Sequence, residues 1–149
     1  MYRVLLVDDE ILIRNVISQS IKWLELGYVL AGTCKNGKEA VEFIMNHPVD
    51  VVLTDICMPY LDGMELTKFI FHNFNKINVI IFSGFNDFEY AKNAIRYKVK
   101  EYLLKPVTTC ELSKTLISLK DQMDKKKEED KKYETYIKNR LLIDATSFQ

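Results

Sequence analysis

Residues 2–10 read YRVLLVDDE, an apolar run that ends directly in three adjacent carboxylates, Asp8, Asp9 and Glu10. A short, continuously apolar run is typical of a strand that is covered on both faces of a sheet. Two carboxylates about 4 Å apart repel each other by roughly 4 kcal/mol at an effective dielectric of 20. Their position at the end of a buried strand leaves two alternatives: a solvated helix start favoured by the helix dipole, or a cation site.

Four further short apolar runs alternate with stretches of helical periodicity. Ile13, Ile17, Ile21 and Leu24 recur at spacings of three and four and predict one helix, and Asn86 with Glu89 predicts a capping box further along the chain. The alternation predicts an α/β domain over residues 1–122, with a doubly wound, five-stranded parallel sheet of the flavodoxin type in the order 2-1-3-4-5. The expected strands span residues 2–7, 28–33, 49–54, 78–82 and 101–104.

The composition limits the classes of function. A chain of 149 residues that is 48% hydrophobic predicts one globular domain with a proper core. Lys plus Arg and Asp plus Glu are both 21, so the basic excess of a nucleic-acid-binding surface is absent from the sequence. Cys34, Cys57 and Cys110 lack the spacing of a zinc site and predict reduced thiols. No apolar run is long enough to cross a membrane, and we expect a soluble, cytoplasmic protein with no membrane partner.

Polar groups that carry chemistry follow four of the five apolar runs. Asp8 and Asp9 follow the first, Asp55 the third, Ser83 the fourth and Lys105 the fifth. Because the carboxyl ends of parallel strands lie at one edge of a sheet, these groups are expected to converge. Carboxylate oxygens without nitrogen or sulfur ligands favour a hard cation, Mg²⁺ first and Mn²⁺ as the alternative. This convergence favours the cation site over the solvated helix start.

Four segments resemble the receiver domain of two-component response regulators, the CheY-like family. They are LLVDDE (residues 5–10), VVLTDICMPYLDGMEL (51–66), IIFSG (80–84) and YLLKPV (102–107). The resemblance implies that Asp55 accepts a phosphoryl group from a sensor histidine kinase. It further implies that Asp8, Asp9 and Asp55 hold Mg²⁺ together with the backbone carbonyl of Cys57.

The same resemblance gives roles to four residues in the last two strands and after them. Lys105 would pair with Asp55 and then with the phosphate, and a cis bond to Pro106 would aim the lysine. Ser83 would be the switch hydroxyl, and Tyr102 the switch aromatic, with an ordinary half-buried strand tyrosine as the alternative for Tyr102.

The segment SGFNDFEYAKNAI (residues 83–95) resembles receivers of the YesN type, which usually precede an AraC-type DNA-binding domain. We therefore expect residues 123–149 to be a charged helical linker, extending the last helix and leading to an effector domain outside this chain. DNA would be a partner only through that domain. A homodimer would form through the face of the fourth helix, fifth strand and fifth helix, or through the C-terminal helix.

Two other functions stay open beside the phosphorylation-controlled transcriptional switch. A Mg²⁺-dependent phosphatase of the haloacid-dehalogenase kind also uses a strand-end Asp, but it requires a second acid where Cys57 stands. A docking module that acts without phosphorylation would not need the acid pair or Lys105. The receiver reading implies a switch rather than an enzyme, with activity limited to phosphorylation of itself from small donors and removal of that phosphoryl group.

Overall fold

A five-stranded parallel sheet lies at the centre of the computed structural model, which describes residues 1–84 and 88–146. Its strand order is β2-β1-β3-β4-β5, so the predicted fold class and order are confirmed. The registers place the carboxyl ends of neighbouring strands together: Val7 pairs with Thr54, and Ser83 with Leu104. The strands are β1 (Tyr2–Val7), β2 (Tyr28–Cys34), β3 (Val51–Thr54), β4 (Asn78–Ser83) and β5 (Glu101–Leu104).

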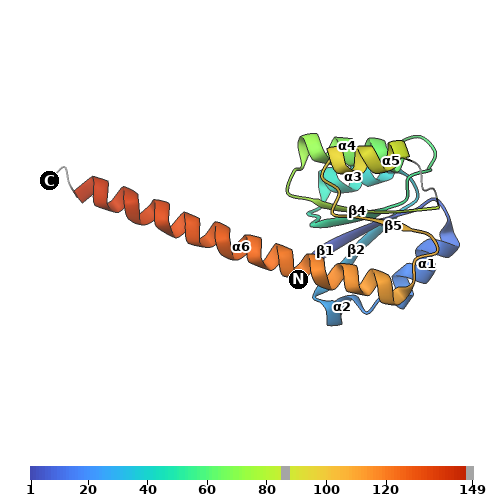
Figure 1. Ribbon diagram of the computed structural model, residues 1–149, viewed down its shortest axis with the longest axis horizontal. Coiled ribbons are helices and arrows are strands. Elements are labelled where there is room, and N and C mark those ends of the chain that lie inside the picture. Colours follow the sequence, from blue (N-terminus) through green and yellow to red (C-terminus); the bar gives the residue numbers. More distant parts are fainter. Residues whose placement is uncertain (85–87, 147–149) are drawn as a thin grey trace. The chain divides into compact units, whose positions relative to one another are not determined.

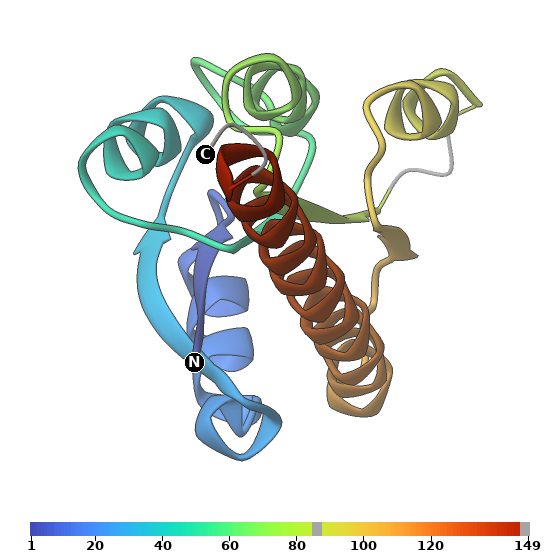
Figure 2. The same ribbon diagram turned by 90° about the vertical axis from the view of Figure 1, so that its left-hand side faces the viewer.

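The helices follow the strands as the alternation predicts. Figure 1 and Figure 2 show α3, α4 and α5 in a row on one face of the sheet, and Figure 1 shows α1 on the other face. The chain divides into a compact unit over Met1–Thr115 and a second unit from Leu116 onward. The helices are α1 (Ile11–Ser20), α2 (Trp23–Leu26), α3 (Gly37–Asn46), α4 (Gly63–Asn73), α5 (Phe88–Arg96) and α6 (Thr109–Thr146).

The three central strands explain why their sequences are continuously apolar. The side chains at 4–7 in β1, 51–53 in β3 and 80–82 in β4 are at most 1% exposed. Helices cover both faces of a doubly wound sheet, so none of these positions faces water and no polar alternation is needed there. Burial of these side chains holds the strands in place, and the residues that follow each strand are positioned as a result.

The prediction of one continuous helix through Ile21 and Leu24 is wrong. Helix α1 ends at Ser20, because the backbone at Ile21 is extended (φ −85°, ψ 131°), and a separate short helix, α2, follows. Ile21 is 5% and Trp23 8% exposed, and the Trp23 indole N–H donates to the carbonyl oxygen of Ser18 at 3.0 Å, whereas Leu24 is 64% exposed. Burial of two large side chains outweighs continuation of the helix.

Helix α4, which follows the third strand, begins with a capping box that sequence analysis missed. The backbone N–H of Glu65 donates to Oδ1 of Asp62 at 2.8 Å, and the backbone N–H of Asp62 donates to Oε1 of Glu65 at 3.3 Å. Two N–H groups that a helix start leaves without partners are thereby satisfied. The box that we predicted at Asn86 and Glu89 lies outside the described residues.

Helix α6 is 38 residues long, and exposed ion pairs one turn apart stabilise its charged part. Glu128 and Lys132 lie 3.6 Å apart, and Lys120 with Asp124 is closer, at 2.7 Å. Each such exposed pair stabilises the helix by only about 0.3–0.5 kcal/mol, so the effect depends on several pairs acting together. Among the helices of residues 1–84 and 88–146, none combines the length and the apolar character that a membrane crossing requires.

The three cysteines should differ sharply in reactivity. Cys34 is buried at the end of β2, and burial raises the pKa of its thiol from 9.0 to about 11, whereas Cys57 and Cys110 are exposed. Since the thiolate is the reactive form, a raised pKa and lack of access both protect Cys34 at pH 8. We expect a thiol reagent such as dithionitrobenzoate to modify two thiols quickly in the native protein and the third only in denaturant. Rapid modification of Cys34 in the native protein would contradict this placement.

Candidate functional site

Three side chains from three strand ends meet at the carboxyl edge of the sheet. Asp8 follows β1, Asp55 follows β3 and Lys105 follows β5. The Nζ atom of Lys105 lies 3.2 Å from Oδ2 of Asp8 and 3.2 Å from Oδ2 of Asp55. The convergence predicted from the strand ends is therefore present for these three residues, which lie 47 and 50 positions apart along the chain.

Backbone hydrogen bonds fix each of the three residues to the neighbouring strand. The N–H of Asp8 donates to the carbonyl oxygen of Cys34 at 3.1 Å, and that of Asp55 to Val7 at 3.0 Å. The N–H of Lys105 donates to the carbonyl oxygen of Ser83 at 2.8 Å. The bond between Lys105 and Pro106 is cis, as the resemblance implied. The side chains therefore start from backbone that the sheet holds in place.

Burial and charge oppose each other in this site. Asp8 is 0% and Asp55 6% exposed, and burial raises the pKa of both carboxyls despite the nearby Lys105 ammonium. Burial alone would lower the pKa of Lys105, but the charges of Asp55 and Asp8 outweigh it and raise that pKa. One ammonium is shared by two buried carboxylates, so the site favours the arrival of further positive charge.

Asp8, Asp9 and Glu10 present carboxylate oxygens within 4.8 Å of one another. Asp8 is buried, whereas Asp9 and Glu10 are exposed. The charge of Asp9 also contributes to the raised pKa of Asp55, which places the two acids within electrostatic reach. An all-oxygen donor set with excess negative charge fits a hard divalent cation. Cys57 is exposed two residues beyond Asp55, so its thiol is not part of this acidic group.

The two predicted switch residues lie in the strands on the β5 side of the sheet. Ser83 is the last residue of β4 and is 0% exposed, and Tyr102 is half-buried within β5. Ser83 is joined to Lys105 by the backbone hydrogen bond described above. The structure places Ser83 at the same edge as Asp55, while the switching roles of both residues stay predictions.

Two residues that support the site were missed by sequence analysis. The guanidinium of Arg14 donates to the backbone carbonyl oxygen of Asp8 at 2.6 Å and holds the turn after β1. Gly63 donates its N–H to the carbonyl oxygen of Ile56 at 2.7 Å, and a Cβ at Gly63 would collide with the backbone carbonyl oxygen of Asp55. The DG pair signalled a turn, but the close approach of α4 to the acceptor loop depends on tertiary packing.

A doubly wound parallel sheet with buried acids and a shared lysine at its carboxyl edge defines the class as a signalling receiver of the CheY-like fold. The response regulator receiver domain family matches residues 4–117. The chain belongs to this family. Within it, the REC domain of AraT from Geobacillus stearothermophilus is similar in structure, with a TM-score of 0.79 and 34% identity over 85% of this chain and 98% of that one.

Two curated relatives are named as transcriptional regulatory proteins. The transcriptional regulatory protein YesN of Bacillus subtilis is 40% identical over 143 residues, which is 95% of this chain and 38% of YesN. HptR of Staphylococcus aureus is 41% identical over 112 residues, or 75% of this chain and 44% of HptR. The chain thus spans less than half the length of these relatives.

Proposed function

We propose that Asp55 accepts a phosphoryl group from the phosphohistidine of a sensor histidine kinase and that its phosphorylation switches a transcriptional output. The observation that carries this proposal is the position of Lys105, whose ammonium lies 3.2 Å from an oxygen of Asp55 at the carboxyl edge of the sheet. Phosphoryl transfer depends mainly on positioning and charge stabilisation, and this site supplies both.

The chemical step uses the Asp55 carboxylate as nucleophile. An oxygen of Asp55 forms a bond to phosphorus while the donor's P–N bond breaks, and the electron pair of that bond stays on the imidazole nitrogen. The product on this chain is an acyl phosphate. Lys105 would then bind a phosphate oxygen, and the Ser83 hydroxyl would donate to another, while Tyr102 follows the rearrangement of β5.

Mg²⁺, or Mn²⁺ in its place, would be held by Asp8, Asp9, Asp55 and the backbone carbonyl of Cys57. The donor chemistry supports this, because carboxylate and carbonyl oxygens suit such ions and the buried carboxylates carry more negative charge than Lys105 balances. When bound, the ion would neutralise charge on the transferring phosphoryl group.

The output would belong to a longer protein. We propose that the receiver extends to about residue 122 and that residues 123–149 link it to a DNA-binding effector domain, because YesN and HptR are transcriptional regulators more than twice the length matched here. Dimerisation would accompany the switch. An apolar surface on α5 and β5 supports it, since Ile95 is 81% and Leu104 44% exposed.

Incubation with acetyl phosphate and Mg²⁺ tests the function. We expect the intact mass to rise by one phosphoryl group, with label that is lost in hydroxylamine and absent when a chelator removes the divalent cation. Continued hydrolysis of general phosphate esters would instead favour the phosphatase. Absence of label under all conditions, including incubation with the purified kinase of the same system, would favour the docking module. Either result would overturn the proposal.

A further inference from the structure

A cavity lies at the edge of the sheet opposite the one that carries Asp55. Its volume is about 360 Å³, and it is bounded by the end of α4, the start of β4 and the turn between α5 and β5. Asp55 follows the carboxyl end of β3, whereas Asn78 and Val79 of this cavity open strand β4. The size falls within the range of small-molecule sites, and the function proposed above does not use the cavity.

One wall of this cavity is apolar and aromatic. Ile70, Ile77 and Val79 line this wall, with Ile77 half-buried and the other two buried, and Phe71 and Tyr97 contribute rings whose centroids lie 5.6 Å apart. Aromatic walls offer a planar ligand more contact than aliphatic ones do, with a preference for offset or edge-on stacking. The wall therefore suits a ligand with a flat ring.

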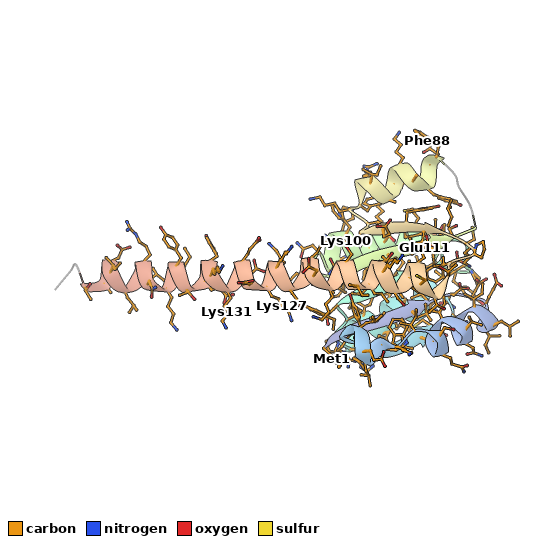
Figure 3. All side chains as sticks on the ribbon, turned by 60° about the horizontal axis from the view of Figure 1, so that its bottom comes forward. Met1, Phe88, Lys100, Glu111, Lys127 and Lys131 are labelled. Carbon is orange, nitrogen blue, oxygen red and sulfur yellow. The ribbon has the colours of Figure 1, made fainter. Side chains whose placement is uncertain are left out.

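The polar part of the lining is positive. Lys98 and Lys100 line the cavity, as do the amides of Asn75 and Asn78, and no Asp or Glu is among its lining residues. Within residues 1–84 and 88–146, no salt bridge engages either lysine ammonium. Figure 3 labels Phe88 at the start of α5 and Lys100 in the segment between the end of α5 and the start of β5. Two cations that form no salt bridge favour an anionic group on the ligand.

The backbone at Lys98 gives an independent reason to assign a role to its side chain. Lys98 has φ 54°, in the left-handed region, where it ends α5 in a Schellman motif: Val99 N–H donates to Ala94 at 2.9 Å and Lys98 N–H to Ile95 at 3.1 Å. Glycine is the usual residue there, because a side chain is unfavourable in this conformation. A lysine at a position that favours glycine is a reason to test whether its ammonium has a role in this cavity.

We infer that this cavity binds a small aromatic anion, with its ring against Phe71 and Tyr97 and its phosphate or carboxylate between Lys98 and Lys100. A nucleoside monophosphate and an aromatic carboxylate share this chemistry. The site is separate from the acceptor site, which lies at the carboxyl edge of the sheet.

The test is a titration of the ¹⁵N-labelled chain with AMP and with benzoate, followed by the backbone amide shifts of Tyr97, Lys98 and Lys100. We expect saturable shifts with dissociation constants of about 1 mM or tighter for at least one probe. Adenosine and inorganic phosphate, which each lack half of the recognised chemistry, should bind about tenfold more weakly than AMP, since one charge-assisted contact is worth about 1.4 kcal/mol or more.

The Lys98→Gly and Lys100→Gln variants should each weaken binding of the positive probe about tenfold. Lys98→Gly keeps or raises the melting temperature, because glycine relieves the left-handed backbone, so its loss of binding is not a loss of fold. Lys92→Gln, an exposed change on the same helix that does not line the cavity, is the matched control and should bind normally. Unmoved amides with both probes up to about 10 mM, equal binding of phosphate and AMP, or normal binding by both lysine variants would overturn the inference.

Discussion

Asp55→Asn will lose acceptance of the phosphoryl group from acetyl phosphate by at least about a hundredfold, because an amide is not a nucleophile for phosphorus. Asparagine has the shape of aspartate and can keep the hydrogen bond from the N–H of Ile56, which reaches Oδ1 of Asp55 at 2.8 Å. The measurement is intact-mass spectrometry after incubation with acetyl phosphate and Mg²⁺. The loss therefore reports the missing carboxylate and not a disturbed loop.

The stability of the same variant gives a second readout: stability should rise in Asp55→Asn, whereas phosphoryl acceptance is lost. Burial raises the pKa of Asp55, so the stability that this group contributes is present below its unfolded pKa and is lost as pH rises through the folded pKa. Asparagine does not ionise, so the variant avoids this loss of stability at higher pH. Lys105 keeps Asp8 as a partner at 3.2 Å. Without divalent cations at pH 7, we expect the variant to be more stable than the parent chain.

Glu42→Gln is the control for both readouts, because Glu42 is exposed on α3 and away from the acidic edge. It should take up the phosphoryl group and melt as the parent chain does. Label that persists in Asp55→Asn, or that moves to Asp8 or Asp9, would show that Asp55 is not the acceptor.

Gly63→Ala should destabilise the receiver unit by about 3 kcal/mol or more, the upper end of overpacking costs. The added Cβ would collide with the backbone carbonyl oxygen of Asp55 and lie 2.9 Å from Cα of Ile56. Backbone atoms cannot rotate away as a side chain would, so α4 must move from the loop after β3. We expect the melting temperature to fall by about 10 °C, measured by circular dichroism.

Gly84→Ala is the matched control, since a Cβ at Gly84 has no atom within 4 Å in the described structure. Helix propensity alone would predict the opposite result at Gly63, because alanine is about 1 kcal/mol better than glycine inside helices. An unchanged or raised melting temperature in Gly63→Ala would show that α4 can shift freely and that its approach to Asp55 is not fixed.

The fold and the meeting of Asp8, Asp55 and Lys105 could be predicted because both depend on patterns that run along the chain. Continuous apolar runs marked the strands buried on both faces, and parallel topology brought the residue after each run to one edge. The extension of the last helix into the charged segment could likewise be expected, because opposite charges there lie one turn apart, as in Glu128 and Lys132.

The features that escaped prediction depend on three-dimensional contacts with no periodic signal. The break at Ile21 results from burial of Ile21 and Trp23, which periodicity reads as a continued helix. The tight packing at Gly63 appears only when α4 lies on the loop of Asp55. The left-handed backbone of Lys98 likewise requires the end of α5 to be known, because the residue type alone predicts an ordinary exposed lysine.

The hydrogen bond from the N–H of Lys105 to the carbonyl oxygen of Ser83 has a mechanical consequence. It joins the ends of β4 and β5, so the Lys105 ammonium beside Asp55 and the Ser83 hydroxyl belong to two residues that are hydrogen-bonded through their backbones. If a phosphoryl group on Asp55 draws one of these two donors inward, the hydrogen bond moves the other residue with it. The ends of β4 and β5 should therefore move together, in one step, and not independently of each other.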